Sequence, residues 1–169
     1  TNLVEMYCYW NRLSSLDVSA CQVLTILDCS CNSMTNLNLG RNPLLDTLRC
    51  NSNRLSGLSV SSCPALSELI CGGNALTVLD VSGNVGLKTL SCGQNRLGRL
   101  DLSRNTNLVH LSCSWNLITN LDISANTNLE QVVATGNPLT EIKVWWTPPT
   151  NVPLHVKLLY SGSPVLRNP

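Results

Sequence analysis

A cysteine recurs every 21 residues along most of this chain, and a leucine and an asparagine recur at the same interval. The cysteines are Cys8, Cys29, Cys50, Cys71, Cys92 and Cys113. The leucines run from Leu3 to Leu129, and the asparagines are Asn11, Asn32, Asn53, Asn74, Asn95, Asn116 and Asn137. A fixed period of about 20–50 residues marks a solenoid, in which each repeat forms one turn of a coil. Because the repeated positions are those that build the coil, the pattern favours a scaffold over an enzyme.

The composition argues against several classes of function. Only 12% of the residues are charged, the formal net charge is +1, and no Lys/Arg cluster exists, so we do not expect a nucleic-acid interface. No apolar run approaches the roughly 20 residues of a membrane span, and no secretory signal is present. Thr1 and Asn2 match the end of an internal repeat at Thr106 and Asn107, so we expect the chain to be part of a longer protein.

One repeat follows the pattern LxxLxCxxNxLxxLDLSxNxx, whose second half echoes the spacing of the first. Leu90 and Cys92 are two residues apart, which predicts a strand that turns both side chains inward. Asn95 follows where the chain must turn, and a buried Asn can pair backbone groups that the turn leaves open. The remaining 11 residues cannot hold a two-turn helix and its connections. We therefore expect a right-handed parallel β coil with a second extended segment in each turn and little or no helix.

The last repeat departs from the pattern and predicts a boundary. Residues 1–144 form seven repeats, the first of them incomplete, and residues 145–169 form a C-terminal cap and tail. A solenoid must cover its terminal core, and Trp145 and Trp146 suit that role, with ligand stacking as the alternative. Residues 151–160 read as one more strand, because apolar residues alternate at Val152, Leu154, Val156 and Leu158.

The LxxLxCxxN segment resembles that of leucine-rich-repeat proteins from Leu3 to about Val144. The 21-residue length, the cysteine at the sixth position and the LDLS segment resemble a bacterial subclass with a cysteine ladder, seen in internalin-like surface proteins with nested 10+11 repeats. This resemblance implies a leucine-rich-repeat solenoid that serves as a non-catalytic protein-binding or adhesion module. It implies a secreted or surface location on a bacterium and a host or bacterial surface protein as partner. It implies no catalytic residue and no cofactor.

The cysteines are expected to be mostly reduced, buried thiols. Stacked ladder cysteines have parallel Cα–Cβ bonds, whereas a disulfide needs a dihedral near 90°. Cys21 and Cys63 share a repeat position but lie two turns apart, about 10 Å, beyond the roughly 7 Å limit for a bridge. His110 points outward and Cys113 inward, so a Cys–His nucleophile is not expected.

No metal site is predicted. A column of back-face residues comprises Asp17, Asp80, Asp101 and Asp122, interrupted by Asn38 and Ser59. Stacked carboxylates could bind Ca²⁺, but such residues more often accept hydrogen bonds from turn amides. Cys29 and Cys31 lack the second ligand pair of a zinc site. Arg12, Arg54 and Arg96 share one edge of the coil, which we read as a solvated edge.

The outward side of the first strand is the predicted binding face, because its residues vary between turns while the inward set barely changes. The candidate partner-binding residues are Tyr7, Tyr9, Trp10, Asp28, Arg49, Ile70, His110 and Trp115. Tyr and Trp are typical of binding hot spots, since they bury much area and keep a polar handle. Small residues in the middle of the face, at Gly72, Gly73 and Gly93, would let a partner backbone approach closely.

Three alternatives to this prediction remain open at this point. Tyr7, Tyr9 and Trp10 could pack on an upstream turn instead of a partner. The coil could be a structural spacer without its own ligand. The aromatic residues could also stack on sugars, which would make the chain a glycan-binding module.

Overall fold

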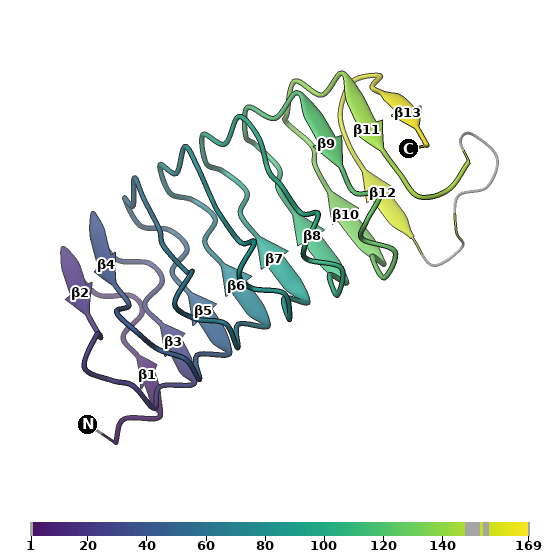
Figure 1. The fold of residues 1–169 in the computed structure, drawn as a ribbon. Coiled ribbons are helices and arrows are strands. Elements are labelled where there is room, and N and C mark those ends of the chain that lie inside the picture. The colour runs from purple at the N-terminus through teal and green to yellow at the C-terminus, as the bar shows by residue number, and fades with distance from the viewer. Residues whose placement is uncertain (1, 148–152, 154–155, 169) are drawn as a thin grey trace.

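The computed structural model describes residues 2–147, 153 and 156–168, which wind into an elongated coil of stacked turns (Figure 1). Every strand is three residues long. The strands are β1 (Glu5–Tyr7), β2 (Ser15–Asp17), β3 (Ile26–Asp28), β4 (Asn36–Asn38), β5 (Thr47–Arg49), β6 (Glu68–Ile70), β7 (Thr89–Ser91), β8 (His110–Ser112), β9 (Asn120–Asp122), β10 (Gln131–Val133), β11 (Glu141–Lys143), β12 (Lys157–Leu159) and β13 (Val165–Arg167).

One long parallel sheet runs the length of the coil and takes one strand from each turn. Its order is β1-β3-β5-β6-β7-β8-β10-β12. The register follows the sequence period, so that Leu48 of β5 pairs with Leu69 of β6, and Leu69 pairs with Leu90 of β7. Residues at one repeat position therefore lie side by side along the sheet. We call this the first-strand sheet.

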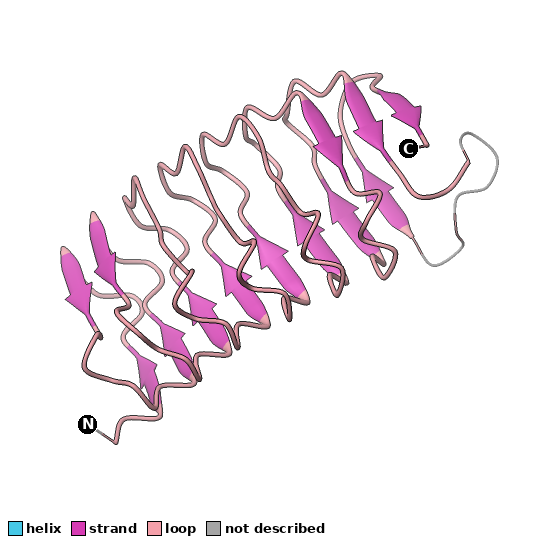
Figure 2. Ribbon diagram, viewed as in Figure 1, coloured by secondary structure: helices cyan, strands magenta, loops and turns pink. Residues whose placement is uncertain are grey.

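The opposite side of the coil is less regular (Figure 2). Two short parallel sheets lie there, β2-β4 near one end and β13-β11-β9 near the other. In the three turns between them the second half makes no strand, and Gly57 and Gly98 lower the β-propensity in two of these turns. The predicted second segment is thus a strand in some turns and an irregular extended segment in others. The described residues contain no helix that could cross a membrane.

The core is built from the inward residues of both halves of each turn. Leu90 and Cys92 on the first-strand side are 1% and 0% exposed. Leu97, Leu100 and Leu102 on the other side are also buried. This arrangement confirms the predicted solenoid and its inward set, and it leaves the outward residues of the first strand outside the core.

The predicted asparagine ladder joins each turn to the one before it. The Asn95 Nδ2 donates to the carbonyl of Cys92 in its own turn, at 3.0 Å, and to that of Cys71 in the preceding turn, at 3.2 Å. The Asn95 Oδ1 accepts the backbone N–H of Leu76, at 3.0 Å. Asn11 bonds only carbonyls of its own turn among the described residues.

A second asparagine ladder, which the sequence analysis did not predict, runs along the opposite side of the core. Its members are Asn42, Asn84, Asn105 and Asn126, all fully buried. The Asn105 Nδ2 donates to the carbonyls of Val81 and Asn84 in the preceding turn, both at 2.9 Å. The Oδ1 atom of each member has no hydrogen-bond partner among the described residues. Cys21 and Cys63 stand at the same repeat position in the remaining early turns.

All nine cysteines lie in the described part of the chain as unpaired thiols, and six of them are buried. Burial raises the pKa of the Cys29 and Cys113 thiols to about 12. These thiols stay protonated at neutral pH, which removes the thiolate that nucleophilic or redox chemistry requires.

Both sides of the coil continue into the C-terminal segment. β12 pairs with β10 and β13 pairs with β11, so the strand predicted within residues 151–160 is present at Lys157–Leu159. Trp146 is 5% exposed and packs edge-on against Trp145, with ring centroids 4.7 Å apart. Val152 and Leu154 lie outside the described residues. The division of the chain into repeats and cap at residue 144 stays a prediction.

Candidate binding face

The first-strand sheet arranges its outward side chains in rows, because the register pairs equivalent positions of neighbouring turns. Tyr7 pairs with Asp28, Asp28 with Arg49, and Arg49 with Ile70. These four candidate residues therefore form one row across β1, β3, β5 and β6. His110 begins β8, in a different row and farther along the coil. The candidates form two groups on one face rather than one cluster.

The aromatic candidates on this face are exposed to solvent. Trp10 is 78% exposed, Trp115 64% and Tyr7 53%. Asp28 differs from the expectation of an outward, accessible side chain, since it is only 9% exposed. Its carboxylate folds back to accept hydrogen bonds from the backbone N–H and the hydroxyl of Ser30, which leaves little of it for a partner.

Polar partners fix two side chains in the row. The Arg49 Nε lies 2.8 Å from the Glu68 Oε1, and this contact raises the pKa of Arg49. The Tyr7 hydroxyl donates to Glu5 at 3.0 Å, which raises the pKa of the Tyr7 hydroxyl. The exposed ion pair between Arg49 and Glu68 stabilises the fold by about 0–1 kcal/mol, so its main effect is to hold the Arg49 side chain in place.

The corner that follows each first strand has a left-handed backbone, a feature that the sequence analysis missed. The seven corner residues, with φ between 54° and 71°, are Trp10, Cys31, Ser52, Gly73, Gln94, Trp115 and Gly136. The only sequence signal of this conformation is glycine at two of the seven equivalent positions. A left-handed backbone costs a non-glycine residue roughly 1–2 kcal/mol. Trp10 and Trp115 are the two tryptophans at this position, and both are exposed.

Trp115 rests on the next turn of the coil. A Cβ on Gly136 would lie 2.7 Å from the Trp115 Cδ2, so the indole ring lies directly against the Gly136 backbone. Trp115 also borders a shallow depression of about 320 Å³ on the first-strand face. The depression is lined by small and neutral residues, among them Gly72, Ser91 and Ser112.

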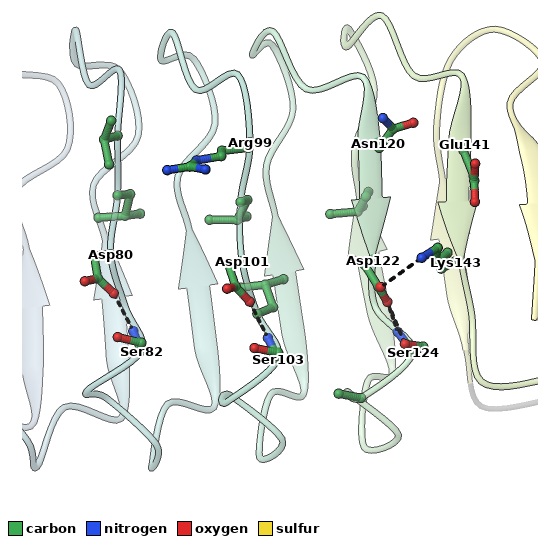
Figure 3. A pocket seen from close by; sticks show the side chains of 16 residues that line it. Asp80, Ser82, Arg99, Asp101, Ser103, Asn120, Asp122, Ser124, Glu141 and Lys143 are labelled. Atoms are coloured by element: carbon green, nitrogen blue, oxygen red, sulfur yellow. Dashed lines mark hydrogen bonds and ion pairs between the residues drawn. The ribbon is translucent and has the colours of Figure 1, made fainter. Parts of the chain in front are cut away.

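A second hollow lies on the opposite side of the coil, above the aspartate column (Figure 3). It measures about 870 Å³. The Asp101 Oδ1 accepts the backbone N–H of Ser103 at 3.0 Å, and bonds from the amide and the hydroxyl of Ser103 lower the pKa of Asp101. Asp80 has the same contact with its serine, while the Lys143 Nζ lies 3.8 Å from the Asp122 Oδ2. The column thus accepts turn amides, as predicted.

The metal ligands and the Cys–His pair considered in the sequence are not brought together among the described residues. No three His, Cys, Asp or Glu among them gather as ligands of a metal ion would. His110 is exposed on β8, whereas Cys113 is buried with its pKa raised to about 12. His155 lies outside the described residues. What the first-strand face presents is a set of exposed aromatic, polar and small residues on a fixed backbone.

Comparison with known proteins identifies the fold. Neither a protein-family model nor a curated protein sequence matches the chain. The internalin InlF from Listeria monocytogenes matches with a TM-score of 0.81 and 19% identity, over 96% of this chain and 48% of that one. The leucine-rich-repeat domain of APL1B matches with a TM-score of 0.67 and 22% identity, over 82% of this chain and 47% of that one.

The functional domain of InlJ from Listeria monocytogenes, which includes a cysteine ladder, is 27% identical over 85% of this chain and 44% of its own length, with a TM-score of 0.44. The chain spans about half the length of these solved structures. The InlF and APL1B structures establish a leucine-rich-repeat solenoid, which confirms the fold expected from the repeat.

Proposed function

We propose that this leucine-rich-repeat solenoid is a non-catalytic binding module of a bacterial surface or secreted protein, and that it binds another protein through the first-strand face. The observation that carries the proposal is the exposure of Tyr7, Tyr9, Trp10 and Trp115 on this one face. Tyrosine and tryptophan are enriched at binding hot spots, and none of these four side chains belongs to the core.

The stiffness of the coil supports the proposal. The asparagine ladder joins successive turns, and ladder hydrogen bonds run along the whole first-strand sheet. The face is therefore ordered before any partner arrives, and binding loses little conformational entropy. A binding module gains affinity from such preorganisation, whereas a spacer needs stiffness but no exposed aromatic residues.

Binding to a candidate partner tests the proposal with two matched variants. The front-face variant carries Tyr7→Ala, Tyr9→Ala, Ile70→Ser and Trp115→Ala. The back-face variant carries Val78→Ser and Arg99→Ala, two changes on the opposite side of the coil. Each protein is immobilised and exposed to bacterial surface and host extracellular extracts, and captured proteins are identified by mass spectrometry. Circular dichroism establishes that all three proteins are folded.

The proposal predicts a protein that the parent and the back-face variant retain and that the folded front-face variant loses. Retention of the same proteins by all three would place binding elsewhere on the coil. If no extract yields a retained protein, the spacer function is favoured, and a domain at the free end of the coil would then carry the activity.

A further inference from the structure

The depression beside Trp115 has a neutral lining. Ser91 and Ser112 in this lining continue the row that carries Asp28 and Arg49 in earlier turns, but neither is charged. The depression covers four neighbouring turns and contains no charged residue. Gly72 and Gly93 place no side chain above the sheet, and a Cβ on Gly72 would lie 2.9 Å from the Gly93 oxygen. Backbone atoms therefore form the floor of the depression. An uncharged ligand matches this lining, because no charged side chain is present to pair with a charged one.

Trp115 borders the depression, and the following turn of the coil holds its ring in position. The indole lies against Gly136, where a Cβ would come within 2.7 Å of the ring. Gly136 also has a φ of 71°, so any other residue there would be strained as well as obstructed. Trp115 nevertheless remains 64% exposed. This leaves a rigid aromatic surface available to a ligand in the depression.

The backbone of the depression offers few hydrogen bonds to a ligand. The corner N–H groups of Gly73, Gln94 and Trp115 donate to carbonyls of the following turn, at 2.9, 2.7 and 2.8 Å. An extended peptide that needs main-chain partners would find these groups occupied. By contrast, the side chains of Ser91, Ser112 and Gln94, which line the depression, make no hydrogen bond to the described residues.

We propose that this depression binds a neutral carbohydrate, with a sugar ring stacked against the indole of Trp115 and its hydroxyls bonded to Ser91, Ser112 and Gln94. A sugar ring has an apolar C–H face that suits an aromatic surface and a rim of hydroxyl groups that both donate and accept. Serine hydroxyls and a glutamine amide also donate and accept, so the two sets of groups are matched. The inference rests on the proposed function, because it names the chemistry that part of the same face recognises.

Oligosaccharide binding tests this inference. The probes are soluble neutral hexose and N-acetylhexosamine oligosaccharides, together with sialylated counterparts, and binding is measured by saturation-transfer NMR and calorimetry. Trp115→Ala is the test variant, and Leu117→Ala is its matched control. Leu117 is 58% exposed and lies two residues from Trp115, but it does not border the depression.

The inference predicts that a neutral oligosaccharide binds, that Trp115→Ala weakens binding by about tenfold or more, and that Leu117→Ala changes it by less than about twofold. Thermal unfolding establishes that both variants are folded. Absence of binding by every neutral probe, equal loss in the two variants, or undiminished binding by Trp115→Ala would overturn it.

Enzymatic deglycosylation of a captured protein distinguishes this inference from the proposed function. If the front-face variant loses a partner that the parent retains equally before and after enzymatic deglycosylation, the proposed function holds, and the oligosaccharide measurement alone decides the carbohydrate inference. If deglycosylation and Trp115→Ala each abolish retention, both proposals stand.

Discussion

At the residue scale, the corner after each first strand combines strain with exposure. The left-handed backbone at this position costs a non-glycine residue roughly 1–2 kcal/mol, and no burial offsets that cost at Gln94, which is exposed. The corner residues therefore contribute to stability mainly through their backbone.

Replacing Gln94 by glycine should therefore raise the free energy of unfolding by about 0.5–1 kcal/mol, since relief of strain exceeds the added freedom of the unfolded chain. Arg96→Gly is the matched control, because Arg96 is exposed two residues away with a negative φ. It should lower the free energy of unfolding by about 0.5–1 kcal/mol. Urea unfolding measures both changes, and a loss of stability in both variants would show that the corner is unstrained.

The ladder asparagines make different hydrogen bonds, so their replacement should lower the free energy of unfolding by different amounts. Asn95→Ala leaves the carbonyls of Cys71 and Cys92 and the N–H of Leu76 without their side-chain partner inside the coil. It should cost at least about 2 kcal/mol. Asn11→Ala removes bonds within one exposed turn and should cost less than about 1 kcal/mol. Equal costs by chemical unfolding would argue that the bonds between turns add nothing.

The first asparagine ladder could be predicted from the sequence. The second asparagine ladder and the left-handed corner could not, and particular residues explain why. Asn95 recurs without interruption, whereas the column of Asn84 is broken by Cys21 and Cys63. The left-handed corner holds side chains as different as Gln94 and Trp115, because a positive φ restricts the backbone and not the side-chain chemistry.

At the element scale, the strand pairing of the first halves was predictable and that of the second halves was not. A strict 21-residue period fixes the register, so the row from Tyr7 to Ile70 follows from the sequence alone. The burial of Asp28 does not, because it depends on how its carboxylate meets Ser30. The second segments that pair as strands could not be predicted, because the spacing of apolar residues is the same in turns that pair there and in turns that do not.

The stacking of the cysteine ladder inside the first-strand sheet predicts a graded thiol reactivity. Cys8, Cys21 and Cys31 are half-buried, while the other six thiols are buried. A colorimetric thiol reagent should label at most these three quickly in the native protein and all nine after unfolding. Fewer than nine groups in the unfolded protein would reveal disulfides. Fast labelling of all nine in the native protein would mean that the sheet opens readily.

At the scale of the whole molecule, the buried thiols make stability depend on alkaline pH. Burial raises the folded-state pKa of Cys29 and Cys113 from 9.0 to about 12 and that of Cys50, Cys71 and Cys92 well above 9.0. Unfolded thiols ionise near pH 9, so stability is complete below that pH and falls as the pH rises toward the folded-state values.

The urea midpoint should accordingly stay constant from about pH 7 to 8 and decline above about pH 9. Replacing Cys71 and Cys92 by valine should make the decline shallower, because fewer thiols then ionise on unfolding. A midpoint that does not change up to pH 11, or an equal decline in the variant, would contradict this origin of the pH dependence.

We propose that the molecule divides into inward residues that hold the coil together and outward first-strand residues that are free to bind. The direct measurement is the free energy of unfolding of the front-face variant, with Tyr7, Tyr9, Ile70 and Trp115 replaced, beside that of Leu90→Ala. Four surface changes should together cost less than about 2 kcal/mol, while the single core change should cost about 2–5 kcal/mol. A front-face variant that loses as much stability as Leu90→Ala, or fails to fold, would show that these residues hold the coil together and would contradict a free binding face.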